Sequence, residues 1–127
     1  MGRAIIGGAV AVLMFDAAAA WASLVFGFPY GTVAIGSWII YAVVGFVAGR
    51  YSGVLAALVA GVAVGLVDAS AGWAISWMIG PGRVPGAELT AARWTAAAIY
   101  VAVIAGVAAT VGGVIGRFTR PTSFPEA

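Results

Sequence analysis

Two aspartates are the residues of this sequence whose type and spacing could do chemistry. Asp16 and Asp68 each interrupt a long apolar stretch, ten residues before Phe26 and eleven residues before Ile79. At about 1.5 Å per helical residue, each carboxyl group lies roughly 15–17 Å below the end of its helix, near the middle of a membrane. An ionised carboxylate at that depth costs about 2.5–3.5 kcal/mol. We therefore expect at least one of the pair to be protonated at neutral pH, or a cation to be bound between them.

The composition indicates the same membrane setting. Of the 127 residues, 64% are hydrophobic and only 8% are charged, whereas about a quarter of the residues in a soluble globular domain are charged. His, Cys and Lys are absent, which removes most nucleophiles, metal ligands and general bases. We expect a protein of the lipid bilayer that is not an enzyme and that uses no cofactor, no metal and no nucleic acid.

Long uncharged runs predict four transmembrane helices, because about 20 apolar residues cross a hydrocarbon core roughly 30 Å thick. We expect these helices at residues 4–26, 32–49, 53–79 and 93–116, with Gly- and Pro-containing turns between them. The predicted fold class is an all-α integral membrane protein. A polar tail at residues 118–127 is expected to be disordered.

The first and third expected helices repeat one another. Superposing residues 8–29 on residues 60–81 gives nine identities in 22 positions, one of which aligns Asp16 with Asp68. A chain this rich in Ala, Gly and Val would give about three by chance. The two aspartates are therefore expected at matched depths in two copies of one unit.

The second and fourth expected helices also repeat one another, at a shift of 67 residues. Residues 44–52 and 111–119 both read Val-Gly-x-Val-x-Gly-Arg, followed by an aromatic residue and a hydroxyl residue. We therefore expect two tandem helical hairpins, at residues 1–53 and 54–117. Because each hairpin crosses the membrane twice, the copies would be parallel repeats related by an axis along the membrane normal.

Arginines set the expected orientation. Four of the six lie on the side that carries both termini, and the positive-inside rule then places the termini in the cytoplasm; they are Arg3, Arg50, Arg117 and Arg120. We expect these four to act as topology signals or lipid-headgroup contacts, and all five Trp residues to form an aromatic belt on the other side. The excess is only two arginines, which leaves a dual topology open.

The N-terminus also has a competing interpretation. Residues 3–20 resemble a secretory signal peptide, against which stand the acid at the end of the apolar region and the recurrence of the segment inside the chain. The absence of Lys beside abundant Ala, Gly and Arg is typical of a GC-rich bacterial genome. We expect a multi-pass protein of the bacterial inner membrane.

Small residues mark the expected helix contacts. One face of the third helix carries Asp68 among small side chains, which lets a neighbouring backbone approach closely; its other members are Gly61, Gly65, Gly72 and Ser76. Two small-x-x-x-small pairs near the inner surface are Gly45 with Gly49 and Gly112 with Gly116. Tyr41 is the expected uncharged partner of the aspartates, with Ser70 and Thr110 as further candidates.

These features favour a transporter or channel in which Asp16 and Asp68 carry a proton or cation. Four helices hardly enclose a path, so a homo-oligomer or a larger membrane complex is expected. The alternative is a non-catalytic scaffold or complex subunit in which the acids and glycines only fix helix packing. An intramembrane aspartyl hydrolase is a third possibility, although Val67 stands where presenilin-type motifs carry Gly.

In outline the chain is similar to two families. Small multidrug transporters are four-helix chains with an acid in the first helix, and proteolipid subunits of rotary ATPases are tandem hairpins with one carboxylate each. Here the acid recurs in the third helix and lies in the first helix of each hairpin. No site residue is therefore transferred from either family.

Overall fold

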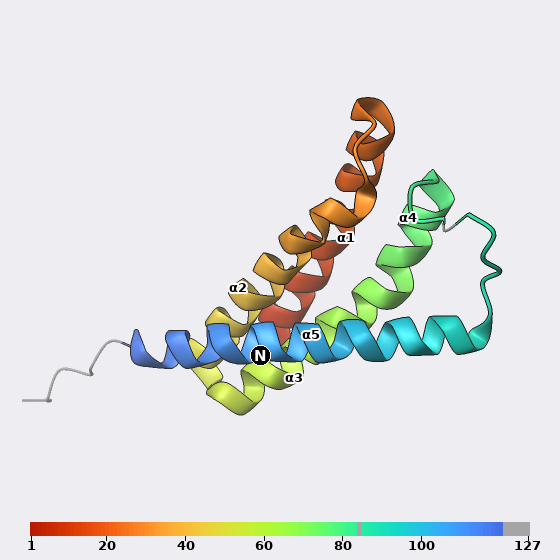
Figure 1. Cartoon of the computed structure of the whole chain (residues 1–127). Helices are drawn as coiled ribbons and strands as arrows, with labels where there is room; N and C mark the ends of the chain where they lie inside the picture. The colour runs from red at the N-terminus through yellow and green to blue at the C-terminus, as the bar shows by residue number, and fades with distance from the viewer. Residues whose placement is uncertain (84, 121–127) are drawn as a thin grey trace, which may run out of the picture.

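The structure is a computed structural model that describes residues 1–83 and 85–120. Its regular elements, within those residues, are all helical (Figure 1). They are α1 (Gly2–Phe26), the 3₁₀ turn η1 (Tyr30–Val33), α2 (Ala34–Ser52), α3 (Val54–Val67), the π-helical turn η2 (Asp68–Gly72), α4 (Trp73–Ile79) and α5 (Ala91–Phe118).

These elements form four helices long and apolar enough to cross a membrane, which confirms that part of the prediction. They run over Gly2–Phe26, Tyr30–Ser52, Val54–Ile79 and Ala91–Phe118. The helices extend past several predicted ends because a terminal Arg can reach toward water while its backbone stays helical. The last helix includes Phe118, and residues 121–127 of the expected disordered tail lie outside the described residues.

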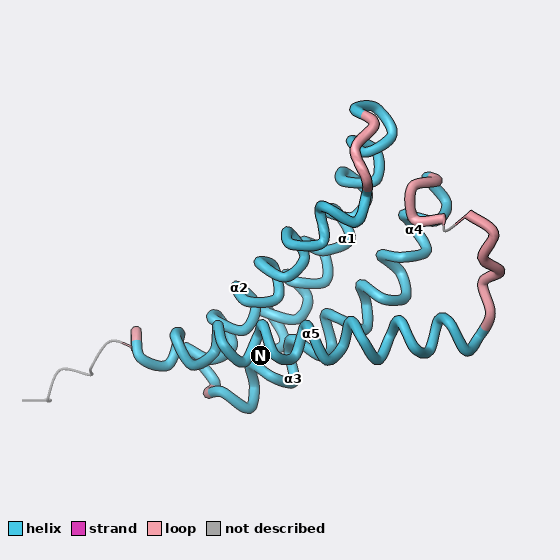
Figure 2. Tube along the Cα trace, in the orientation of Figure 1, coloured by secondary structure: helices cyan, strands magenta, loops and turns pink. Residues whose placement is uncertain are grey.

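Glycines end the first two long helices. Gly27 has φ 72° and Gly53 has φ 94°, a conformation that a Cβ atom disfavours. The tight turns produced in this way bring α2 back along α1 and start α3 directly after α2. Figure 2 shows these short connections and the longer loop that leads from α4 to α5.

The third long helix confirms the helix expected over residues 53–79 and contains a π-helical turn, η2, between α3 and α4. At the π-helical turn, the extra residue shifts the backbone hydrogen-bond pattern. The indole nitrogen of Trp94 donates to the carbonyl oxygen of Ala69 at 2.8 Å, and the hydroxyl of Ser70 donates to that of Leu66 at 2.6 Å. Side chains thus bond carbonyl groups in and beside this turn.

The four long helices are unequally packed. Helix α5 crosses the others and packs mainly on α2 and α3, whereas α1 contacts α2, α3 and α4 (Figure 1). Within the described residues, α1 makes no contact with α5. The core beneath these crossings consists of small side chains together with Tyr41, so the helices approach closely.

Glycines form the contact between α2 and α5. A Cβ atom added at any of four glycines would overlap the backbone of the opposite helix. These contacts are Gly45 with Ala109, Gly112 with Ala42, Gly49 with Gly113, and Gly116 with Phe46. The four contacts form two equivalent pairs under the 67-residue shift of the sequence repeat. Adding 67 to the α2 residue and subtracting 67 from the α5 residue converts Gly45–Ala109 into Gly112–Ala42, and Gly49–Gly113 into Gly116–Phe46. The two helices therefore use the same face against each other.

The small face of the third long helix meets two different neighbours. Gly61 and Gly65 face α5, where an added Cβ would lie 2.6 Å from the Ala105 carbonyl oxygen and 2.6 Å from the Ala105 Cβ, respectively. Gly72 instead faces α1, opposite Asp16. Gly72 is the last residue of the π-helical turn, and α4, which begins at the next residue, also contacts α1.

Candidate functional site

The structure brings the two aspartates together from separate helices. Asp16 lies in the middle of α1, and Asp68 is the first residue of the π-helical turn. Both carboxyl groups lie over Gly72: a Cβ atom there would be 2.8 Å from Asp68 Oδ1 and closer still to Asp16 Oδ2. Because Gly72 has no side chain, the space above its backbone holds one oxygen of each acid.

Tyrosines from the second long helix bind the other two carboxyl oxygens. The Tyr41 hydroxyl donates to Asp68 Oδ2, and the Tyr30 hydroxyl donates to Asp16 Oδ1 at 3.4 Å. Tyr41 is almost completely buried. Each acid thus accepts one phenolic hydrogen bond through one carboxyl oxygen. The other two oxygens, Asp16 Oδ2 and Asp68 Oδ1, both lie over Gly72.

Asp16 Oδ2 is the atom that most needs a partner. The Asp16 side chain is only 4% exposed, and among the described residues no hydrogen-bond donor reaches its Oδ2 atom. A buried charged oxygen without a donor is strongly unfavourable. A proton on either carboxyl group would supply an O–H donor between the two acids, and a bound cation would neutralise them instead.

The remaining predicted partners do not reach the aspartates. Ser70 donates to backbone carbonyls of α3, and Thr110 donates to the carbonyl oxygen of Gly106 at 2.7 Å. A helical Ser or Thr hydroxyl readily bonds a carbonyl of the preceding turn, which explains both cases. The sequence analysis missed Tyr30, because it lies in a turn whose direction the helical pattern does not define.

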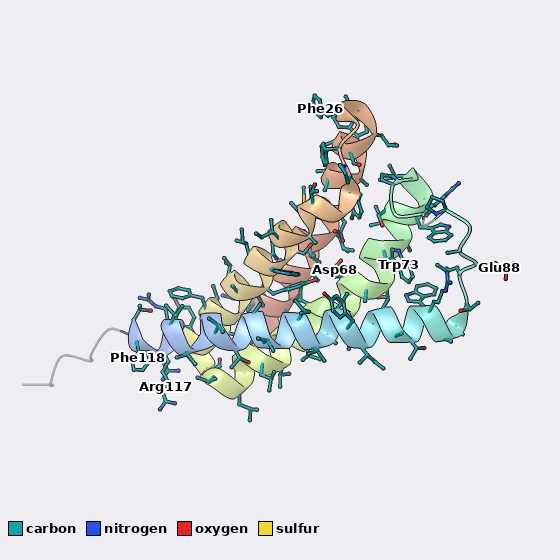
Figure 3. The ribbon with its side chains drawn as sticks, viewed as in Figure 1. Phe26, Asp68, Trp73, Glu88, Arg117 and Phe118 are labelled. Carbon is teal, nitrogen blue, oxygen red and sulfur yellow. The ribbon has the colours of Figure 1, made fainter. Side chains whose placement is uncertain are left out.

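A cavity of about 290 Å³ lies beside the acid pair. It is bounded by residues of α1, η1, α2, η2, α4 and α5, and its polar wall consists of Asp16, Asp68, Tyr30, Tyr41, Ser37 and Ser76. The rest of the wall is mainly apolar, with aliphatic residues and the aromatic rings of Phe15, Trp38, Trp73 and Tyr100. Figure 3 shows Asp68 and Trp73 in the wedge between the α1–α2 pair and α4.

The arginines lie away from this pair. Arg50 and Arg117 are in the last turns of α2 and α5, and Figure 3 shows Arg117 at the end of α5, distant from Asp68. Arg120 donates to the carbonyl oxygens of Arg50 and Gly49. Positive charge at a helix C-terminus also interacts favourably with the helix dipole. The arginines therefore complete helix ends and leave the acids without a guanidinium partner.

The chemistry of the site is that of a carboxyl pair among phenols and aromatic rings. Residues 1–83 and 85–120 contain no group of three or more His, Cys, Asp or Glu side chains that could hold a metal ion. Comparison with protein-family models, curated proteins and solved structures finds no match for the chain. The residues of the site place two carboxyl oxygens close enough for the acids to share a proton.

Proposed function

We propose that this protein is a small multi-pass membrane transporter or channel whose Asp16–Asp68 pair carries a proton or exchanges it for a cation. It acts without catalysing a chemical reaction, in the bacterial inner membrane, with both termini in the cytoplasm. Four apolar helices of sufficient length support membrane insertion. So does the exterior, where many large apolar side chains are exposed along the helices, because lipid is their natural surrounding.

A tandem pair of hairpins is the architecture that we propose for this membrane protein. Its support is the contact between α2 and α5, in which Gly45 meets Ala109 and Gly112 meets Ala42. A shift of 67 residues exchanges these contacts, as expected for two copies related by a two-fold axis. The acids belong one to each copy, so the pair would lie close to that axis.

The observation that carries the proposed function is the buried Asp16 Oδ2 atom beside Asp68. Two carboxyl groups this close, one of them almost fully buried, are poorly stable when both are ionised. Binding a proton or cation removes that instability. Releasing the proton or cation leaves both carboxyl groups ionised again, so the pair favours binding a new positive charge. An acid pair that must be neutralised, and that borders a cavity, is suited to pick up and release positive charge.

The proposal is tested by ion flux in liposomes that contain the purified protein. An imposed pH gradient should drive proton movement in the wild type. Asp16→Asn, Asp68→Asn and the double variant should each abolish it, whereas Glu88→Gln, which removes a carboxylate from an exposed loop, should leave it unchanged. Equal flux in all of these proteins, after correction for protein content, would refute the proposal.

Because four helices border a cavity but hardly enclose a path, we propose that the working form is a homo-oligomer or part of a larger membrane complex. Cross-linking in native membranes tests this, and a protein that transports as a monomer would contradict it. The cavity lies within one chain, so each copy would carry its own acid pair.

A scaffold is the second candidate, and the Tyr41 hydrogen bond to Asp68 favours it. In that role the acids would only join α1, α2 and the π-helical turn. Asparagine variants would then lower the stability of the assembled protein, and the wild type would show no flux. Measuring thermal stability on the flux samples separates the two candidates.

A further inference from the structure

We propose that the groove between α1 and α2 binds an anionic phospholipid, with an acyl chain along the groove and the phosphate group at Arg3 and Arg50. This groove shares no lining residue with the cavity beside the acid pair. The inference uses the membrane setting of the proposed function and does not depend on transport. Three features carry it: the apolar walls, the length of the groove and the positive charge at one end.

The walls of the groove are apolar. It has a volume of about 340 Å³ and runs along α1 from Arg3 to Ala11 and along α2 from Ile39 to Val47. Apart from Arg3, every residue that lines it is Ala, Gly, Ile or Val. The α1 wall has only small apolar side chains, which leaves a hollow against the larger Ile and Val side chains of α2.

The groove faces the exterior of the helix pair. Ile39 is 60% exposed and Val43 is 56% exposed, so these side chains border the opening. At the base, a Cβ atom added to Gly8 would lie 3.0 Å from Val64 and closer still to Val44. Helix α1 therefore packs directly on α2 and α3 there. A chain in the groove would contact packed helices on one side and lipid on the other.

The length of the groove matches an acyl chain. On each helix its ends are eight residues apart, which is about 12 Å at 1.5 Å per residue. One leaflet of a bilayer contributes about 15 Å of hydrocarbon, half of roughly 30 Å. Volume divided by length gives a mean cross-section of about 28 Å², against roughly 80 Å² for a helix 10 Å across. The groove therefore admits a lipid chain and is too narrow to hold a helix of a second copy.

Two arginines stand at one end of the groove. Arg3 lines it, and Arg50 is in the last turn of α2. Arg50 follows Val43 by seven residues, so it lies on the same face of α2, beyond Val47. Because α1 and α2 are antiparallel, the first turn of α1 and the last turn of α2 are at the same end of the pair. The groove therefore ends in positive charge.

No carboxylate in the described part of the chain compensates for this charge. Its acids are Asp16 and Asp68, which face each other, and Glu88, which lies in the loop before α5. Figure 3 shows Glu88 at the end of α5 opposite Arg117, whereas the backbone of Arg50 lies against the Arg117 end. Arginine forms charge-assisted, often bidentate hydrogen bonds with phosphate. An anionic headgroup would therefore supply a matching negative charge.

A second groove, between α3 and α5, shows what the arginines add. It has a volume of about 740 Å³, and its wall carries no charged residue, with Thr95 and Thr110 as the polar members. The acyl chains of any lipid can fill such a groove. Of these two grooves, the one between α1 and α2 ends at guanidinium groups, so selectivity for an anionic headgroup is assigned to it.

The test counts phospholipids bound to the purified full-length protein in detergent micelles by native mass spectrometry. The probes are dioleoylphosphatidylglycerol, whose headgroup carries one negative charge, and dioleoylphosphatidylcholine, which has the same chains and a neutral headgroup. Because each arginine near an anionic headgroup adds about fivefold in affinity, phosphatidylglycerol should bind about 10- to 25-fold more tightly. Glycerol 3-phosphate, which is a headgroup without chains, should not displace it.

Matched variants locate the lipid. Arg3→Gln and Arg50→Gln should each lower the affinity for phosphatidylglycerol about fivefold. Arg117→Gln should leave it nearly unchanged, because α5 does not line this groove. Ala11→Leu should weaken binding of both lipids about fivefold, because about ten atomic contacts with the chain are lost. Ala18→Leu is its control, since Ala18 is seven residues further along the same face of α1 and outside the groove.

Equal affinity for the two lipids would overturn the inference, and this comparison uses wild-type protein, so it requires no variant to fold. Equal losses in Arg117→Gln and Arg50→Gln would also overturn it, by indicating diffuse attraction to that end of the molecule. Displacement of the lipid by glycerol 3-phosphate would overturn it by indicating a site for a free phosphate group. Liposome flux is a separate readout: lipid selectivity without flux would refute transport alone, and flux without selectivity would refute the lipid site alone.

Discussion

Replacing Gly72 with alanine should separate the two acids without changing any charge. Gly72 has ordinary helical dihedral angles, φ −63° and ψ −48°, so the substitution introduces no backbone strain. Its only direct effect is a methyl group where Asp16 Oδ2 and Asp68 Oδ1 lie. The variant therefore tests whether the proximity of the carboxyl groups, and not merely their presence, is needed.

The size of the effect follows from the distances. The added Cβ would lie 2.8 Å from Asp68 Oδ1, and ordinary contacts begin at 3.4 Å. That oxygen must retreat by the difference of about 0.6 Å, and Asp16 Oδ2 must move further. Overpacking of this kind costs about 1–3 kcal/mol, while the helix propensity gained by replacing Gly with Ala is about 0.8–1 kcal/mol. The net loss in unfolding free energy should be about 0–2 kcal/mol.

Function should suffer more than stability in this variant. Proton flux should fall about tenfold or more, because small displacements of interacting groups have large effects on their chemistry. The assays are liposome flux and SDS-induced unfolding in mixed micelles. Gly7→Ala is the control: its Cβ would meet no atom within 4 Å, so flux should not change and stability should rise slightly. Wild-type flux and stability in Gly72→Ala would refute the proposed pairing.

Three further predictions concern packing and hydrogen bonds. Gly45→Ala and Gly112→Ala should each lower the unfolding free energy in SDS by about 1–3 kcal/mol. The double variant should lose less than the sum of the two single losses, because the first substitution already separates the helices. Strict additivity would contradict a shared interface. Tyr41→Phe should lower the unfolding free energy by about 1–3 kcal/mol by removing the donor to the partly buried Asp68 carboxyl group, and an unchanged value would exclude that hydrogen bond. Trp94→Phe should cost about 0.5–1.5 kcal/mol by removing the bond to the π-helical turn, whereas Trp21→Phe should cost little; equal losses would show that the bond adds no stability.

Much of the helical architecture could be predicted from the sequence because its determinants are local. Uncharged runs define where a membrane-length helix can form, and residues such as Gly27 and Gly53 define where it turns back. The distance from each aspartate to its helix end follows from the rise per residue. Glycine spacing likewise indicates which helix faces can pack closely, as Gly45 and Gly112 do.

The partner of each close-packing face was decided by the tertiary structure. Gly61 and Gly72 follow one predicted stripe, yet one meets α5 and the other meets α1. Gly72 is the last residue of the π-helical turn, whose Ala69 carbonyl oxygen accepts a hydrogen bond from Trp94, 25 residues away. Because helical periodicity is a property of one segment, it does not reveal a π-helical turn whose hydrogen-bond partner comes from another helix.

The site itself shows the same division. That Asp16 and Asp68 are acids within apolar helices and without a cationic partner could be read from the apolar runs around them; Asp16 is buried and Asp68 is partly buried. That Tyr30 turns toward Asp16, and that a cavity borders the acid pair, depends on the way in which helices cross. Sequence determined the position of each acid along its helix because that position is counted along one chain segment. Tertiary structure decided the neighbours of each acid because they come from several segments packed together.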